Sequence, residues 1–499
     1  MRHQVMKELG GSVTIVVLGA SGDLAKKKTY PALFGLYRNG FLPEQTHIVG
    51  YARSSLDLNT FIERVTEHIK VTGDDAALLT RFVAKLSYIS GSYSNDEGFQ
   101  ALNDHVSSWE QHQETCHRVF YMALPPSVFV EVARGLKRNV YNSRGSNRII
   151  VEKPFGRDLD SSRELGKQLS QLFDELEIYR IDHYLGKEMV KNVMTVRFAN
   201  IFFSQIWNRM NVDNIQITFK EPFGTEGRGG YFDDFGIIRD VMQNHLLQVL
   251  TLIAMEPPIS TDSEAIRDEK VKVLRCIPPI SLDDTLLGQY VGTEDGSKPG
   301  YLDDDSLSNK NSKTPTFAST VLWVQNERWE GVPFILKAGK ALNAAKVEVR
   351  IQFRNVAGSI YRGAARNELV LKVQPDEAVY VKFNNKLPGL SYDTIQTDLD
   401  LSYRHRYTDL RIPDAYESLI LDVLRNDHSN FVRHDELDAS WKIFTPLLHQ
   451  IDQHDPALEI HPYTYGSRGP QALDAFVARY GYDRSTSDYE WPVQNLKNK

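Results

Sequence analysis

The chain has 499 residues and a net charge of −7, with 41% hydrophobic and 25% charged residues. This composition is that of a folded protein and excludes a disordered chain, while the mildly acidic charge gives no reason to expect binding to nucleic acid. A single core rarely extends beyond roughly 250–300 residues, so we expect two domains.

The cysteine content and the lengths of the apolar runs exclude further classes of protein. The two cysteines, Cys116 and Cys276, are too few for a disulfide framework or a cysteine-based zinc site. The longest apolar stretch, Val13–Ala20, is far shorter than a bilayer span. Met1–Gly11 lacks the apolar core of a signal peptide. We therefore expect a cytoplasmic protein that does not associate with a membrane.

Strand-like and helix-like segments alternate in the first part of the chain. The predicted strands are Val13–Leu18, His47–Tyr51, Arg118–Leu124 and Arg148–Glu152, and the predicted helices are Leu24–Tyr37 and Phe61–Lys70. This alternation predicts a Rossmann-like domain over residues 1–180, a doubly wound α/β fold with a parallel sheet.

From residue 181 to residue 499 we expect a second, α+β domain. Its predicted strands are Val212–Lys220, Phe317–Val324, Lys346–Phe353, Leu369–Gln374 and Ala378–Phe383, and its main predicted helix is Ile237–Met255. Consecutive strands with few helices between them predict a large, mainly antiparallel sheet. The polar segment Gly296–Pro315 is the nearest approach to a linker, and we interpret it as a solvated loop, with a cation site at Asp303–Asp305 as the alternative.

The turn after the first predicted strand is the first candidate site. It consists of Gly19, Ala20, Ser21, Gly22, Asp23, Leu24 and Ala25, a GxxGxxA spacing that departs from the common GxGxxG. A strand-to-helix turn offers backbone N–H groups and the positive end of a helix dipole to a phosphate. Glycine permits the close approach of a pyrophosphate, and a small alanine lets the helix pack on the strand. A purely structural turn is the alternative. Lys26, Lys27 and Lys28 either face the phosphates or belong to a solvated helix face.

Arg53, just beyond the second predicted strand, indicates which dinucleotide binds. NAD enzymes usually place a carboxylate here for the ribose hydroxyls. A guanidinium instead forks onto the additional phosphate of NADP. Arg53 therefore favours NADP, and the alternative is an ordinary surface arginine.

Two polar segments suggest a substrate site. In Arg180–Glu188, His183 and Lys187 lie on one face if the segment is helical, where with Tyr184 they would hold a phosphate, although most such mixed strings are surface helices. Lys153 follows a predicted parallel strand, so it would face the ligand crevice, next to a candidate cis-proline, with a simple turn as the alternative.

His245 is the candidate general base, because its unperturbed pKa of about 6.5 suits removal of a hydroxyl proton. Asp240 precedes it by five residues and is therefore not on the same α-helical face. A carboxylate from another segment, such as Asp182, would have to orient the imidazole. A packed histidine without a catalytic role is the alternative. No zinc, calcium or nucleophile-elbow pattern stands out, so the chemistry we expect needs no metal.

Taken together, these strings resemble the glucose-6-phosphate dehydrogenase family. The matching segments, in the family's order, are Gly19–Lys28, Glu152–Arg157, Arg180–Glu188, Phe219–Tyr231, Gly236–Gln248, Gly331–Asn343, Gln374–Pro375 and Tyr465–Pro470. The resemblance implies oxidation of glucose 6-phosphate to the lactone with reduction of NADP, the first step of the oxidative pentose phosphate pathway. It also implies a homodimer or homotetramer formed through the large sheet.

The resemblance also implies residue roles. His245 would be the base, paired with Asp182. The residues matching substrate contacts are Lys153, His183, Tyr184, Lys187, Glu221, Asp240, Lys340 and Gln374, and Lys153 would also contact the cofactor. Two other hypotheses stay open: an enzyme for a different sugar phosphate or an unphosphorylated aldose, and a non-catalytic NADP-binding redox sensor.

Some family members hold a second, structural NADP. The residues at the corresponding positions are Lys337, Lys346, Arg350, Lys372, Tyr380, Lys382, Asp400, Arg468 and Trp491. Ala345 stands where a basic residue is common, and Lys372 where arginine is common. The second change keeps the charge and loses the bidentate fork.

Overall fold

The computed structural model describes residues 11–73, 75–361, 363–407 and 410–484. Two compact units make up the chain, and each is discontinuous in sequence. The first unit comprises Met1–Glu188, Pro258–Val271 and Ile412–Trp441, and the second comprises Met189–Pro257, Lys272–Arg411 and Lys442–Lys499. Three segments that we expected within the continuous domain 181–499, namely residues 181–188, 258–271 and 412–441, are thus grouped with the first unit.

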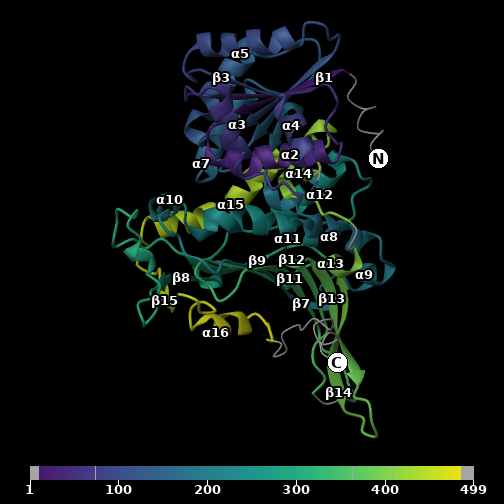
Figure 1. The fold of residues 1–499 in the computed structure, drawn as a ribbon. Coiled ribbons are helices and arrows are strands. Elements are labelled where there is room, and N and C mark those ends of the chain that lie inside the picture. Colours follow the sequence, from purple (N-terminus) through teal and green to yellow (C-terminus); the bar gives the residue numbers. More distant parts are fainter. Residues whose placement is uncertain (1–10, 74, 362, 408–409, 485–499) are drawn as a thin grey trace. The chain divides into compact units, whose positions relative to one another are not determined.

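A six-stranded parallel sheet forms the first unit (Figure 1). Its strands are β1 (Ser12–Leu18), β2 (Thr46–Ala52), β3 (Leu86–Ser90), β4 (Cys116–Met122), β5 (Asn147–Val151) and β6 (Ile178–Arg180). Their order is β3-β2-β1-β4-β5-β6, which is that of the doubly wound dinucleotide-binding fold. The predicted Rossmann-like sheet is confirmed, and its strand order reverses between β1 and β4, where such folds bind ligands.

Both faces of this sheet are buried. Its helices are η1 (Ala25–Thr29), α2 (Tyr30–Arg38), α3 (Leu58–Thr66), α4 (Asp75–Val83), α5 (Asp96–Trp109), η2 (Pro126–Val128), α6 (Phe129–Asn139), α7 (Leu159–Ser170), η3 (Glu175–Glu177), η4 (His183–Gly186) and α14 (Ala415–Leu424). Alternate residues of β1 enter different apolar clusters, since Ile15 packs with α2 and α14 whereas Val16 packs with α5 and α6. Burial on both faces explains why β1 is apolar along almost its whole length.

The second unit is built on a nine-stranded sheet (Figure 1). Its strands are β7 (Val212–Lys220), β8 (Thr285–Val291), β9 (Phe317–Trp323), β10 (Pro333–Gly339), β11 (Lys346–Phe353), β12 (Glu368–Gln374), β13 (Ala378–Lys386), β14 (Thr394–Ser402) and β15 (Ile460–Thr464). The order is β14-β13-β12-β11-β7-β10-β9-β8-β15, and only the β7–β10 and β8–β15 pairs are parallel. The predicted mainly antiparallel sheet is confirmed.

Most helices of this unit are short, and few of them separate its consecutive strands. They are α8 (Glu188–Phe198), α9 (Ile201–Ile206), α10 (Gly229–Asp233), η5 (Ile238–Leu246), α11 (Leu247–Ala254), η6 (Leu282–Asp284), η7 (Tyr301–Asp303), α13 (Tyr403–Arg406) and α16 (Leu473–Ala478). Two further helices, α12 (Ser263–Arg275) and α15 (His434–Asp452), each contain residues of both units. None of the helices in the described part of the chain is long and apolar enough to cross a membrane.

Most of the segment Gly296–Pro315 is exposed, as expected of a solvated loop. Asp304 within it is an exception that the sequence did not indicate, because it is only 8% exposed. Its carboxylate accepts hydrogen bonds from the Thr225 hydroxyl at 2.7 Å and from the Gly227 and Gly229 amides at 3.0 and 3.2 Å. The acidic residue thus satisfies backbone donors of a neighbouring loop, and bonds of this kind hold the pKa of Asp304 down to about 2 against the opposing effect of burial.

Candidate active site

The predicted nucleotide turn adopts the tight geometry that its glycines suggested. Gly19 has a φ of 79°, and its amide donates to the Tyr51 carbonyl at 2.9 Å. A Cβ at this position would lie 2.3 Å from the Ala123 carbonyl oxygen, so no other residue fits without a shift of the backbone. Gly22 closes the turn by donating to the Gly19 carbonyl at 2.9 Å, and Ala25 is fully buried beneath the helix. This turn meets the steric conditions for docking a pyrophosphate.

The lysines beside the turn are largely balanced by carboxylates. Lys27 is 52% exposed and lies 3.0 Å from Asp23, while Lys26 lies 3.4 Å from Asp23 and 3.7 Å from Glu67. Lys27 and then Lys26 lower the pKa of Asp23. The solvated-face interpretation therefore describes Lys27 better than a direct role at the phosphates.

Arg53 is exposed just beyond β2, with its guanidinium 5.6 Å from the centre of the Tyr93 ring. The end of β2 lies beside the turn, since the Ser54 and Ser21 hydroxyls are 3.2 Å apart. A cation next to a dinucleotide turn suits the additional phosphate of NADP.

Lys153 and Asp182 follow neighbouring strands at the carboxyl edge of the sheet. Val151 on β5 pairs with Arg180 on β6, and the Ile181 amide donates to the Val151 carbonyl at 2.9 Å. The Lys153–Pro154 bond is cis, as the sequence suggested. Asp182 is 3% exposed and caps η4 by accepting from the Tyr184 amide at 3.0 Å. The register thus brings both predicted residues to the edge where doubly wound folds bind ligands.

The three residues that we expect to bind a phosphate lie close together, but not on an α-helix. His183–Gly186 is a 3₁₀-helix and Lys187 is extended, so the premise of an i, i+4 helical pair is wrong. The cause is close packing, because a Cβ at Gly186 would lie 2.4 Å from the carbonyl oxygen of Ala415. The cluster is instead organised around Tyr184, whose ring centre lies 4.9 Å from that of His183 and 5.0 Å from the Lys187 ammonium.

Three predicted substrate residues meet within the second unit. The Lys340 ammonium lies 2.6 Å from the Glu221 carboxylate and 3.6 Å from that of Asp240. Glu221 and Lys340 are neighbours because β7 and β10 are parallel and pair Lys220 with Gly339, so both residues follow at the same edge. A cation flanked by two carboxylates offers donors and acceptors suited to several sugar hydroxyls.

His245 lies in η5 and is 3% exposed. This element is a π-helix, so the argument that Asp240 is off its face, which assumed an α-helix, does not hold. In a π-helix the hydrogen bonds join residues five apart, which brings Asp240 and His245 toward one face.

Gln374, the last predicted substrate residue, is half-buried at the end of β12, and its peptide bond to Pro375 is cis.

The residues assigned to a second NADP share one face of the nine-stranded sheet. The pairing register aligns Lys337, Lys346, Arg350, Lys372, Tyr380, Lys382 and Asp400 on that face. Arg468 pairs with Asp474 on α16 at 3.0 Å, and Trp491 lies outside the described residues. Seven positions from five strands therefore converge on a single surface.

That face carries several half-buried cations. Burial, reinforced by the neighbouring Lys220, lowers the pKa of Lys337 to about 7, and burial also lowers the pKa of Lys220 to about 8. Burial alone would lower the pKa of Arg350, but Glu348 and Glu368 outweigh it and raise that pKa. This cluster of lysines, when protonated, makes this part of the face attractive to an anion.

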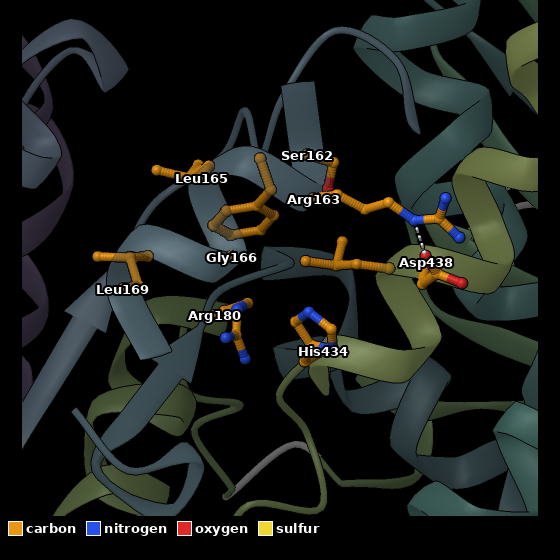
Figure 2. A pocket seen from close by; sticks show the side chains of 10 residues that line it. Ser162, Arg163, Leu165, Gly166, Leu169, Arg180, His434 and Asp438 are labelled. Carbon is orange, nitrogen blue, oxygen red and sulfur yellow. Dashed lines mark hydrogen bonds and ion pairs between the residues drawn. The ribbon is translucent and has the colours of Figure 1, made fainter. Parts of the chain in front are cut away.

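A separate small hollow in the first unit lies beside α7 (Figure 2). Arg180, which begins the predicted phosphate segment, lines it, but both of its terminal nitrogens bind the Glu175 carboxylate at 2.6 and 3.0 Å. Arg163 on α7 pairs with Asp438 at 2.5 Å. These cations are neutralised by carboxylates, so the hollow is not the phosphate site.

Comparison with known proteins decides the family. Residues 16–192 match the family model of the NAD binding domain of glucose-6-phosphate dehydrogenase, and residues 194–491 match that of its C-terminal domain. The chain belongs to the glucose-6-phosphate dehydrogenase family. It therefore carries the nucleotide-binding domain of that family.

Relatives match along almost the whole length. Glucose-6-phosphate 1-dehydrogenase of Emericella nidulans is 59% identical over 97% of this chain and 95% of its own, and that of Saccharomyces cerevisiae is 56% identical over 97% and 96%. A solved structure described as glucose-6-phosphate dehydrogenase in complex with its substrate glucose-6-phosphate aligns with a TM-score of 0.92 at 52% identity, covering 95% of this chain and 99% of that one. The enzyme from Mycobacterium avium aligns with a TM-score of 0.81 at 33% identity over 96% and 99%.

Two residues near the family's site were not singled out from the sequence. Tyr416 on α14 stacks on His183, with ring centres 5.9 Å apart and planes 9° from parallel. Because 232 intervening residues separate them, no local pattern could have found it. Glu152 immediately precedes Lys153 and is buried. Its place at the end of a strand was a usable signal, which the more obvious lysine obscured.

Proposed function

We propose that this chain oxidises glucose 6-phosphate to 6-phosphogluconolactone with reduction of NADP, the first step of the oxidative pentose phosphate pathway. The observation that carries the proposal is the full-length match to curated glucose-6-phosphate 1-dehydrogenases, together with the match to a solved glucose-6-phosphate dehydrogenase described as in complex with that substrate. The meeting of Lys340 with Glu221 and Asp240 supports a polar sugar site in the second unit.

His245 is the general base of the proposed reaction. Its imidazole removes the proton of the anomeric hydroxyl while the hydrogen on the same carbon leaves with its electron pair. NADP, when bound, supplies the acceptor for that hydride. Asp182 pairs with His245 and stabilises the imidazolium that forms, as carboxylate–histidine pairs do. The burial of both side chains supports this role, since a desolvated ion pair is stronger.

The remaining groups bind and orient the two ligands. His183, Tyr184 and Lys187 hold the substrate phosphate, while Lys153 contacts substrate and cofactor. Glu221, Asp240, Lys340 and Gln374 hold the sugar. The residues that would hold NADP are Gly19, Ala20, Ser21, Gly22, Asp23, Leu24, Ala25 and Lys26, and Arg53 would bind its additional phosphate. The fit is supported by the exposed Arg53, because the end of its strand lies beside the turn, with the Ser54 and Ser21 hydroxyls 3.2 Å apart.

The substitution His245→Asn tests the assignment of the base. Loss of a positioned base should reduce turnover by roughly a hundred- to ten-thousand-fold, while folding and NADP binding persist. The matched control is His454→Asn, which changes an exposed histidine of the same unit. Reduced nicotinamide formed from NADP and glucose 6-phosphate is the readout. Near-normal turnover of His245→Asn would refute the role, and an inactive wild type would refute the function.

The choice of substrate has its own test. If His183 and Lys187 bind the phosphate, replacing either should impair oxidation of glucose 6-phosphate far more than oxidation of free glucose. Equal losses for the two substrates would favour an enzyme for an unphosphorylated aldose. A chain that binds NADP without any turnover would instead be a redox sensor.

We also propose that a second, structural NADP binds the polar face of the large sheet. The half-buried Lys337, which lies near the cation of Lys220, supports it. Since that lysine must be charged to attract a phosphate, binding should weaken as pH rises through about 7. Equilibrium dialysis should find two NADP per chain, one in Arg53→Asp and one in Lys337→Met. One NADP per wild-type chain would contradict the proposal. The alanine at position 345 and the lysine at 372 reduce the expected affinity.

A homodimer or homotetramer is the expected assembly, and the cytoplasm the expected location. The edge of the large sheet supports the oligomer, since β14 is an edge strand. Phe383, Ile395 and Leu399 lie on the same face of β13 and β14, and their exposed fractions are 45%, 43% and 59%. Leu399→Lys should lower the sedimentation coefficient, whereas Ile259→Lys should not. A relative from Arabidopsis thaliana, 52% identical, is named cytoplasmic.

A further inference from the structure

A buried carboxyl group lies at the carboxyl edge of the first unit's sheet. Glu152 is 6% exposed and accepts a hydrogen bond of 2.6 Å from the hydroxyl of Tyr121, which is itself fully buried. Within the proposed function, Lys153 has a role and Glu152 has none. The position nevertheless costs stability, because a buried carboxylate is desolvated.

The register of the sheet explains this burial. Tyr121 pairs with Ile150, so the alternation along β5 points Glu152 toward the same face as these two residues. That face is packed with the apolar side chains of α2 and α14, including Leu419. Burial therefore dominates and raises the pKa of Glu152 to about 7, although the Tyr121 hydrogen bond and Lys153 act in the opposite direction.

The charged and titratable groups around this carboxyl all belong to the predicted site or contact it. Lys153 lowers the pKa of Glu152 and Asp182 raises it, so both lie within electrostatic reach. The charge of Glu152 contributes to raising the pKa of Tyr416 on α14, and the Tyr416 ring stacks on that of His183. Tyr121, from β4, is the direct partner. Glu152 thus borders Lys153, Asp182 and the support of His183 at once.

We propose that Glu152, held by Tyr121, is a positioning residue that adjusts the affinity of the site for the anionic sugar phosphate through its own charge. The inference rests on the proposed function. When neutral, Glu152 leaves the Lys153 ammonium available to the ligands. When ionised, it attracts that ammonium and adds a negative charge near the phosphate site, so the substrate dianion binds less tightly.

The substitution Glu152→Gln keeps the shape and removes the ionisation. In the wild type, KM for glucose 6-phosphate should rise by roughly thirtyfold between pH 6 and 8.5, about the effect of one charge ~8 Å from a dianion at an effective dielectric constant of ~40, while kcat changes little on this account. In Glu152→Gln that rise should vanish. In Tyr121→Phe, which removes a bond that stabilises the ionised form, the rise should move to higher pH.

Glu417→Gln is the matched control. Glu417 is a second buried carboxyl of the same unit, and burial raises its pKa to about 7 as well, but it lies under α2, where its carboxyl meets Gly35. This variant should keep the wild-type pH profile. The ionisation of the substrate phosphate is common to all variants and cancels in the comparison.

An infrared difference spectrum between pH 6 and 8 gives a readout that needs no substrate. In the wild type, a protonated carboxyl band with two components, one from Glu152 and one from Glu417, should disappear over this range. Glu152→Gln should remove one of these components. The double variant of Glu152 and Glu417 should show no such band in its difference spectrum. A wild-type pH profile of KM in Glu152→Gln, or an effect on kcat alone, would overturn the inference. Inactivity of the wild type toward glucose 6-phosphate would instead overturn the proposed function.

Discussion

Acidification should destabilise the first unit through one buried histidine, His428. The ring is 2% exposed and stacks on Tyr179, with centres 4.0 Å apart and planes 19° from parallel. Both ring nitrogens are buried without a hydrogen-bond partner among the described residues. Burial and then the nearby Arg267 lower the pKa of His428 from 6.5 to about 4.

The direction of the effect follows from proton binding. Between pH 6.5 and 4 the unfolded chain binds a proton at this position and the folded unit does not, so the free energy of unfolding falls as pH falls. At 1.36 kcal/mol for each pH unit between the two pKa values, the full loss is about 3 kcal/mol. This contribution is present above pH 6.5 and is lost by pH 4.

Thermal unfolding of His428→Phe and His428→Gln measures this loss. Phenylalanine keeps the stack without a titratable group, so the melting temperature of that variant should fall less than that of the wild type between pH 7 and pH 4.5, and glutamine serves as a second neutral replacement. His112→Gln, which changes an exposed histidine of the same unit, should behave as the wild type. Parallel pH profiles of the wild type and both His428 variants would refute the reasoning.

Three substitutions test the ligand sites. Gly19→Ala should destabilise the turn by about 1–3 kcal/mol, because a φ of 79° is strained for alanine and the added Cβ would meet the Ala123 carbonyl. The variant should also lose NADP binding, which fluorescence titration measures. A normal affinity for NADP would contradict the docking role of the turn. Arg53→Asp should weaken NADP selectively, and an unchanged preference for NADP over NAD would exclude Arg53 as the phosphate ligand. Lys340→Met should raise KM for glucose 6-phosphate by at least about tenfold, since it leaves Glu221 without its 2.6 Å partner; a change in kcat alone would place the residue elsewhere in the mechanism.

Much of the fold could be predicted, because buried strands have a recognisable local pattern of apolar residues in the sequence. The bounds of β7 and β11 agree with the predicted segments, since each is a long apolar or alternating run. The strand β14 was not predicted, although its alternating Asp398, Leu399, Asp400 and Leu401 offered such a signal. The π-helix η5 was also missed, since apolar spacing over so few turns does not distinguish it from an α-helix.

The site was predictable where residues follow strands and less so where distant segments meet. Glu221 and Lys340 were each identified, but only the parallel pairing of β7 with β10 explains their contact. The stacking of Tyr416 on His183 depends on where α14 packs, which no local pattern encodes. The role of Asp304 was misjudged for the same reason, because its donors lie in a loop far away in sequence.

The discontinuity of the first unit has a consequence for biosynthesis. Its sheet is complete once residue 188 has been made, but α14, which supplies Tyr416, Leu419 and Val423 to one face, belongs to the segment that ends at residue 441. At ~5–20 residues per second, the ribosome needs roughly 13–50 s to make the 253 residues between those two points. During that interval an apolar face of the nascent dinucleotide-binding sheet lacks its cover, so we expect chaperones that shield nascent chains to bind there before the last third of the protein emerges.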